Sequence, residues 1–72
     1  MLDDTTLKVE VKAKLASAEG LGKAVAINTE VHRGDVLLAG FVREAKTKSE
    51  AARIAGGVKG VKKVINNIAV EP

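Results

Sequence analysis

The sequence predicts a two-layer α+β domain, an α-β-β-α-β sandwich in which two helices cover one face of a three-stranded mixed sheet. Three observations support this fold class. The chain has 72 residues, which is enough for one small core and too few for a second domain. Apolar residues repeat with a helical period in two stretches and with a strand period in three. Glycine-rich breaks separate these stretches, which therefore follow one another as distinct elements.

The composition limits the classes of function that the chain can have. Hydrophobic residues make up 46% of the chain and charged residues 29%, a balance that is typical of a globular domain. The absence of cysteine excludes disulfides and cysteine-ligated zinc. Residues 1–4 are acidic where a signal peptide would be basic, and no apolar run approaches the roughly 20 residues that cross a bilayer. We therefore expect a soluble chain with no signal peptide, whose net charge of +3 weakly favours anionic partners.

Residues 3–18 are predicted to form the first helix. The acidic and hydroxyl side chains at positions 3–6 can accept hydrogen bonds from the first free amides, and their negative charge suits the positive end of the helix dipole. Apolar residues recur every four positions and give the helix one apolar face: Leu7, Val11 and Leu15. The Gly-Leu-Gly sequence at residues 20–22 is predicted to end the helix.

Residues 25–31 and 36–42 are predicted to form the first two strands. Apolar and polar residues alternate in the first of them, so it should be half buried. The four residues His32–Asp35 leave room only for a tight turn, and the two strands should therefore form an antiparallel hairpin. In the second strand, Leu37 and Phe41 should point away from the face that carries Val36 and Leu38.

Residues 44–58 are predicted to form the second helix, and residues 61–70 the third strand. The helix has an apolar face at i, i+3, i+4 and i+7, made of Ala51, Ile54, Ala55 and Val58. A strand, a helix and a returning strand form a right-handed crossover, which places both helices on the same face of the sheet. The opposite face should remain open, and it should carry an apolar stripe.

The apolar stripe on the open face is predicted to be a protein interaction surface, formed by Leu37, Phe41 and Ile65. Its partner can be a neighbouring domain or a second copy of the chain, and lipid contact is a further alternative. Two open faces packed antiparallel would bury Leu37 and Phe41 in a symmetric homodimer. The sequence does not choose among these partners.

The densest basic cluster lies where the third strand begins. It consists of Lys59, Lys62 and Lys63, together with Arg53, and no acidic residue falls between Arg53 and Ala69. With Gly60, these residues form the predicted lipid-binding site. Anionic lipid head groups attract a lysine near the membrane surface by about 1 kcal/mol, and added salt weakens this attraction. A solvated end of the domain with no ligand is the alternative interpretation.

The sequence gives little support for catalysis, metal binding or nucleic-acid binding. His32 is the single histidine, and no pattern places a serine beside it or assembles the three or four ligands of a metal site. Residues 57–60 match the GxxG form with which KH domains clamp a nucleic-acid backbone, but here they join a helix to a strand, and Val58 should be buried. We therefore expect no enzyme activity, no metal, no cofactor and no nucleic-acid partner.

One combination of motifs runs through the chain from about Leu7 to Val70. The motifs are Leu7-x3-Val11-x3-Leu15, Gly34-x-Val36-x-Leu38-x-Gly40-x-Val42, Ala51 with Ile54-Ala55, Val58-x-Gly60-Val61, and Val64-x-Asn66-x-Ile68-x-Val70. In this pattern the chain resembles the BON domain, named for bacterial osmoprotection and nodulation proteins. The stretches around Gly40 and Gly60 are the most specific part.

The resemblance implies an α-β-β-α-β sandwich with a mixed sheet and no catalytic motif. It also implies a periplasmic or envelope location, a link to osmotic or envelope stress, and binding to phospholipid membranes. Since such domains often occur in pairs or beside other modules, residues 1–72 are expected to be a single domain of a longer protein. Thr29 stands where a larger aliphatic residue is usual, so we expect a thinner core at that position.

Overall fold

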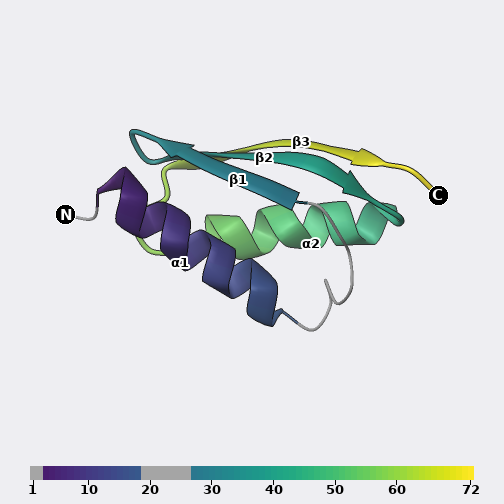
Figure 1. Cartoon of the computed structure of the whole chain (residues 1–72), viewed down its shortest axis with the longest axis horizontal. Helices are drawn as coiled ribbons and strands as arrows, with labels where there is room; N and C mark the ends of the chain where they lie inside the picture. The colour runs from purple at the N-terminus through teal and green to yellow at the C-terminus, as the bar shows by residue number, and fades with distance from the viewer. Residues whose placement is uncertain (1–2, 19–26) are drawn as a thin grey trace.

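The computed structural model describes residues 3–18 and 27–72, and it has the predicted α-β-β-α-β order. Its elements are α1 (Asp4–Ser17), β1 (Ile27–His32), β2 (Asp35–Val42), α2 (Ala45–Gly56) and β3 (Lys63–Val70). The sheet has the strand order β1-β2-β3, with β1 antiparallel and β3 parallel to β2. Both helices lie on one face of this mixed sheet (Figure 1), so the predicted fold class is confirmed.

The bounds of the elements differ from the prediction by one or two residues; α1, for example, ends at Ser17, and β2 begins at Asp35. Helix α2 ends at Gly56 and not at residue 58, because Gly57 caps it with a backbone N–H that bonds to the Ile54 carbonyl at 3.1 Å. Strand β3 begins at Lys63 and not at residue 61, and β1 extends to His32. The predicted helix stop at residues 20–22 and the first two residues of the predicted strand 25–31 lie outside the described residues.

Helix α1 begins where its acidic residues predict. Asp3 is the N-cap, and its Oδ1 accepts a hydrogen bond from the Thr6 backbone N–H at 2.8 Å. This hydrogen bond holds the pKa of Asp3 below its ordinary value of 3.8, because it favours the charged carboxylate. The apolar face of the helix is buried against the sheet, as predicted: Leu7, Val11 and Leu15.

The core lies between the helices and the inner face of the sheet. Val36, Leu38 and Val42 of β2 are completely buried, and the small residues Ala51 and Ala55 of α2 pack into the same cluster. Alternate residues of β2 therefore face the helices, as the period of two predicts.

Thr29 occupies an inner position of β1, opposite Leu38 of β2. Its side chain is only 4% exposed, and its hydroxyl has no hydrogen-bond partner among the described residues. Thr29 stands where a larger aliphatic residue is usual, and it therefore places a buried polar atom inside the core. Burial of an unpartnered hydroxyl destabilises a fold, because the group has lost its hydrogen bonds to water.

The turn between β1 and β2 consists of Arg33 and Gly34, with φ angles of 53° and 86°. Two central residues with positive φ are typical of the type I′ turn, whose twist matches that of the flanking strands. Asp4 fastens this turn to the start of α1. Its Oδ2 accepts from the Arg33 N–H at 2.8 Å and its Oδ1 from the Gly34 N–H at 3.2 Å.

Candidate functional site

Three segments meet at one end of the domain: the start of α1, the Arg33–Gly34 turn and the loop from α2 to β3 (Figure 1). They meet because β2 and β3 are parallel and therefore begin at the same end of the sheet. The Lys62 N–H donates to the Gly34 carbonyl at 2.8 Å. The Lys62 stem also covers Gly34, since a Cβ built on this glycine would lie 3.0 Å from Lys62 Cγ.

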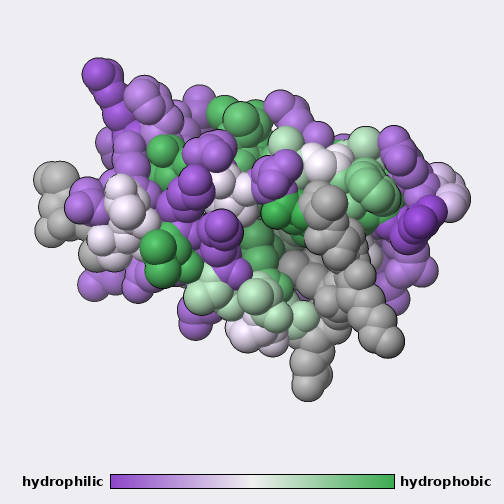
Figure 2. All heavy atoms as spheres, in the orientation of Figure 1, coloured by the Kyte–Doolittle hydropathy of each residue, from purple (hydrophilic) through white to green (hydrophobic). Residues whose placement is uncertain are grey.

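We call this region the basic end, and its members are Arg33, Lys59, Gly60, Lys62 and Lys63. The structure thus brings together four of the five predicted lipid-binding residues with an arginine that the sequence analysis missed. Hydrophilic side chains, purple in Figure 2, predominate at the left of the view, with a few apolar side chains in green among them.

Arg33 could have been found from the predicted topology. A hairpin followed by a right-handed crossover places the hairpin turn and the start of the third strand at the same end of the sheet. The turn residues therefore had to lie beside the loop that carries Lys59 and Lys62. The Arg33 backbone N–H donates to Asp4 Oδ2, and this hydrogen bond holds the Arg33 backbone in place at this end.

Two of the predicted cations have acidic neighbours. Arg53 lies in the last turn of α2, where its Nε donates to Glu50 Oε1 at 3.0 Å. This contact lowers the pKa of Glu50 and raises that of Arg53. Lys63 Nζ lies 4.0 Å from Asp35 Oδ2. Within the described part of the chain, Lys59 and Lys62 form no such pair, so they are the cations most available to an anionic ligand.

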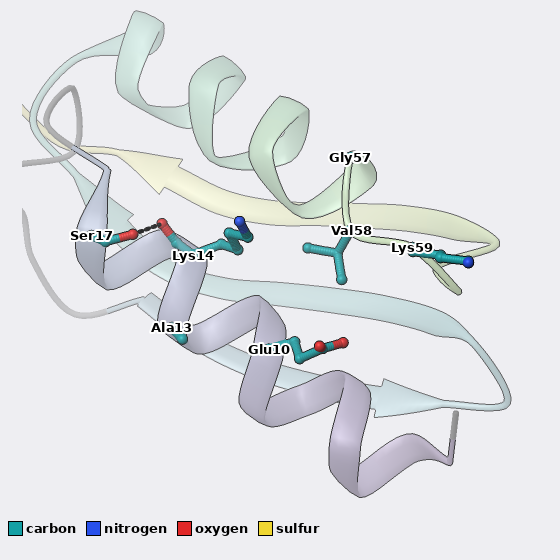
Figure 3. Close-up of a pocket in the computed structure, with 7 residues that line it drawn as sticks. All are labelled: Glu10, Ala13, Lys14, Ser17, Gly57, Val58 and Lys59. Carbon is teal, nitrogen blue, oxygen red and sulfur yellow. Dashed lines mark hydrogen bonds between the residues drawn. The ribbon is translucent and has the colours of Figure 1, made fainter. Parts of the chain in front are cut away.

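A groove of about 670 Å³ runs beside the basic end, between α1 and the end of α2 (Figure 3). Its lining residues are Glu10, Ala13, Lys14, Ser17, Gly57, Val58 and Lys59. Val58 points toward α1 and is 8% exposed, so the prediction that it is buried is confirmed. Its side chain is therefore not free to contact a nucleic-acid backbone. The Ser17 hydroxyl donates to the Lys14 carbonyl at 3.2 Å. Glu10, Lys14 and Lys59 give the groove charges of both signs. The sequence did not predict this groove.

The second predicted surface is the outer face of the sheet, which we call the open sheet face. It consists of the outward residues of the two longer strands: Asp35, Leu37, Ala39, Phe41, Lys63, Ile65, Asn67 and Ala69. Leu37 lies directly beside Ile65 in the register of β2 and β3. Ile65 is 41% exposed and Phe41 is 37% exposed. The three predicted interaction residues thus share one face of the sheet.

The described residues contain no group of three histidine, aspartate or glutamate side chains that could hold a metal ion. In the same residues, no helix has the length and apolar character needed to cross a membrane.

Comparison with known proteins shows what the chain is similar to. The family described as "BON domain" matches residues 3–72. The chain is 32% identical over 71 residues to the outer membrane lipoprotein DolP of Haemophilus influenzae. This alignment covers 99% of the chain but only 37% of DolP, so the chain spans about a third of the length of this relative.

Among solved structures, the C-terminal domain of CdsD is similar, a structural protein of the type III secretion system of Chlamydia trachomatis. The TM-score is 0.79 and the identity 12%, with 99% of this chain and 35% of that chain covered. At this identity the likeness concerns the fold alone. The family match extends from the N-cap of α1 to the last residue, and the chain therefore belongs to the BON domain family.

Proposed function

We propose that this domain is a non-enzymatic binding module of the bacterial envelope, which recognises anionic phospholipid weakly through its basic end. The observation that carries the proposal is the hydrogen bond between Lys62 and Gly34, which joins the lysine loop to the turn bearing Arg33. The similarity to an outer membrane lipoprotein supports the envelope location. A link to osmotic or envelope stress rests on the resemblance to the BON family.

The charges of the basic end set the strength of this interaction. Arg33, Lys59 and Lys62 together supply about 3 kcal/mol of attraction, at about 1 kcal/mol for each cation near an anionic surface. This corresponds to a dissociation constant in the millimolar range or weaker. At physiological ionic strength the Debye length is about 8 Å, so binding should fall steeply with added salt. Stable attachment requires several domains or a second anchor.

Sedimentation with lipid vesicles tests the proposal. Vesicles of phosphatidylcholine alone are compared with vesicles that also contain phosphatidylglycerol, at low and at raised salt. The test variant is Lys59→Glu with Lys62→Glu. The control is Lys12→Glu with Lys46→Glu, which changes the net charge equally at exposed positions of α1 and α2.

We expect the wild type to bind only the anionic vesicles, and more weakly at raised salt. The Lys59→Glu, Lys62→Glu variant should bind at least about 30-fold more weakly, since two lysines contribute about 2 kcal/mol. The control should keep most of its affinity. If both variants lose binding equally, net charge alone drives the attraction and the basic end is not the site. Far-ultraviolet circular dichroism checks that both variants remain folded.

Assembly through the open sheet face is the second candidate function. It is favoured by the exposure of Phe41 and Ile65, two large apolar side chains on the same face. The residues Leu37, Phe41 and Ile65 would make the contact.

A further inference from the structure

The open sheet face carries apolar residues at its middle and charges at both of its ends. In the register of β2 and β3, Leu37 pairs with Ile65 and Phe41 with Ala69, while Asp35 pairs with Lys63 at the start of both strands. We propose that this face binds a second copy of the chain, with the strands of the two copies antiparallel. This proposal is independent of lipid binding.

Two further charged residues lie at the far end of the face, beyond the last residues of β2 and β3. Arg43 follows β2, and its guanidinium lies over the Phe41 ring at 5.9 Å from the centroid. Glu71 follows β3, where its N–H donates to the Val42 carbonyl at 2.8 Å. Arg43 lies in a bend directly after β2, where its contact with the Phe41 ring places it on this face and its Nη1 donates to the Pro72 carbonyl at 3.2 Å. Glu71 directly follows β3, and the strand period of two predicts that it belongs to the same face as Ala69. Strand β2 thus begins with the acidic Asp35 and is followed by the basic Arg43, whereas β3 begins with the basic Lys63 and is followed by the acidic Glu71.

This arrangement is self-complementary about its centre. Ala39 and Asn67 pair in the middle, and the two charged rows lie four residues from them on either side. A two-fold axis that runs across the strands at this row places Asp35 opposite Arg43 of the second copy. It also places Lys63 opposite Glu71 of the second copy. The same rotation sets Leu37 against Phe41, so large apolar side chains meet between the charged rows.

Two other orientations of the second copy fit either the charges or the strands less well. A two-fold axis along β2 would place Asp35 against the same residue of the second copy and Arg43 likewise, and like charges at an interface are repulsive. An axis parallel to the strands between β2 and β3 would match the charges but would leave β1 outside the contact. The antiparallel arrangement matches the charges on β2 and β3 and also brings β1 into the contact at Asn28, which pairs with Ala39 at the axis.

The size of the face predicts the strength of the dimer. Strands β2 and β3 have eight residues each and β1 has six. At about 3.3 Å per residue and about 4.8 Å between the three strands, the face measures at most roughly 26 by 14 Å. Two such faces bury on the order of 700 to 1,000 Å², below the size of a standard stable interface. We therefore infer a transient dimer with a dissociation constant near 1 mM.

Self-association is measured without lipid by sedimentation equilibrium and by amide NMR, on the whole chain from about 0.05 to 3 mM to bracket this affinity. We expect the apparent mass to rise with concentration, and amide signals of Leu37, Phe41 and Ile65 to shift together. Phe41→Asp should weaken association at least about tenfold, since it removes the apolar contact with Leu37 of the second copy and leaves an unpaired charge in the interface. The control Val9→Asp, at a 62% exposed site on α1, should leave association unchanged.

Charge reversal tests the orientation. Lys63→Glu alone and Glu71→Lys alone should each weaken association about threefold to tenfold, because each creates two repulsive pairs. An equimolar mixture of the two variants should associate about as well as the wild type, since the mixed dimer then has both attractive pairs. Both side chains are exposed, so the fold should survive.

Three results would overturn the proposal. The first is an apparent mass that stays monomeric up to the highest concentration, which would leave this face to another domain or to lipid. The second is association that Phe41→Asp does not weaken. The third is a mixture of the two charge variants that associates no better than either one alone, because this outcome excludes the antiparallel contact between Lys63 and Glu71.

Discussion

Replacement of Thr29 by valine should stabilise this domain. Thr29 lies on the inner face of β1, with a side chain only 4% exposed and an Oγ1 atom that has no hydrogen-bond partner among the described residues. Valine has nearly the same shape and the same branching at Cβ, and it suits a strand equally well. The substitution therefore removes a buried polar group without opening a cavity.

The size of the change in the free energy of unfolding follows from the desolvation of the Thr29 hydroxyl. A buried hydroxyl without a partner costs about 1 to 3 kcal/mol, and the added methyl group gains a little from burial. We expect Thr29→Val to raise the free energy of unfolding by about 1 to 2 kcal/mol. In a domain of this size, each kcal/mol shifts the melting temperature by roughly 4 to 8 °C.

Urea unfolding followed by circular dichroism measures this change. The transition midpoint of Thr29→Val should increase while the slope with urea stays constant, since the surface exposed on unfolding is nearly the same. Thr5→Val is the matched control at an exposed position of α1 and should lie within about 0.5 kcal/mol of the wild type. A lower or unchanged midpoint for Thr29→Val would mean that the hydroxyl has a favourable partner and does not destabilise the core.

Three further predictions concern the backbone and the caps. Asp4→Ala should lower the free energy of unfolding by about 1 to 3 kcal/mol in urea titrations, since it frees the turn amides of Arg33 and Gly34. Gly40→Ala should lower the melting temperature, because Gly40 has a φ of 122° and the strain on alanine there costs about 1 to 3 kcal/mol. The contribution of Asp3 is present above its unfolded pKa and is lost as the pH falls through its lowered folded pKa. Acid titrations of the Asp3→Asn variant should therefore show a smaller loss of stability below about pH 4 than the wild type does.

Periodicity was sufficient to predict the elements and their order. Leu7, Val11 and Leu15 marked one helix face, and the alternation through Val36 and Leu38 marked the inner face of the central strand. The right-handed crossover then placed both helices on the same side. The end of α2 was less accurate, since Val58 continues the apolar spacing although Gly57 already caps the helix.

The candidate site was only partly predictable, because its electrostatics depend on contacts that are distant in the sequence. No acidic residue stands between Arg53 and Ala69 in the sequence, yet the fold brings Asp35 to within 4.0 Å of Lys63. It also seats Arg33 beside the lysine loop, which the topology implied but local reasoning overlooked. The groove between α1 and α2 depends on how closely two helices approach, which their apolar faces alone do not determine.

Binding of anionic lipid by the basic end can be mapped residue by residue with an amide NMR titration. The ¹⁵N-labelled chain is titrated with anionic and with zwitterionic micelles, at low and at raised salt. We expect shifts at Arg33 and at residues 59–64 that occur only with the anionic micelles and weaken with salt. Shifts that are the same for both micelles, or that leave these residues unchanged, would contradict this expectation.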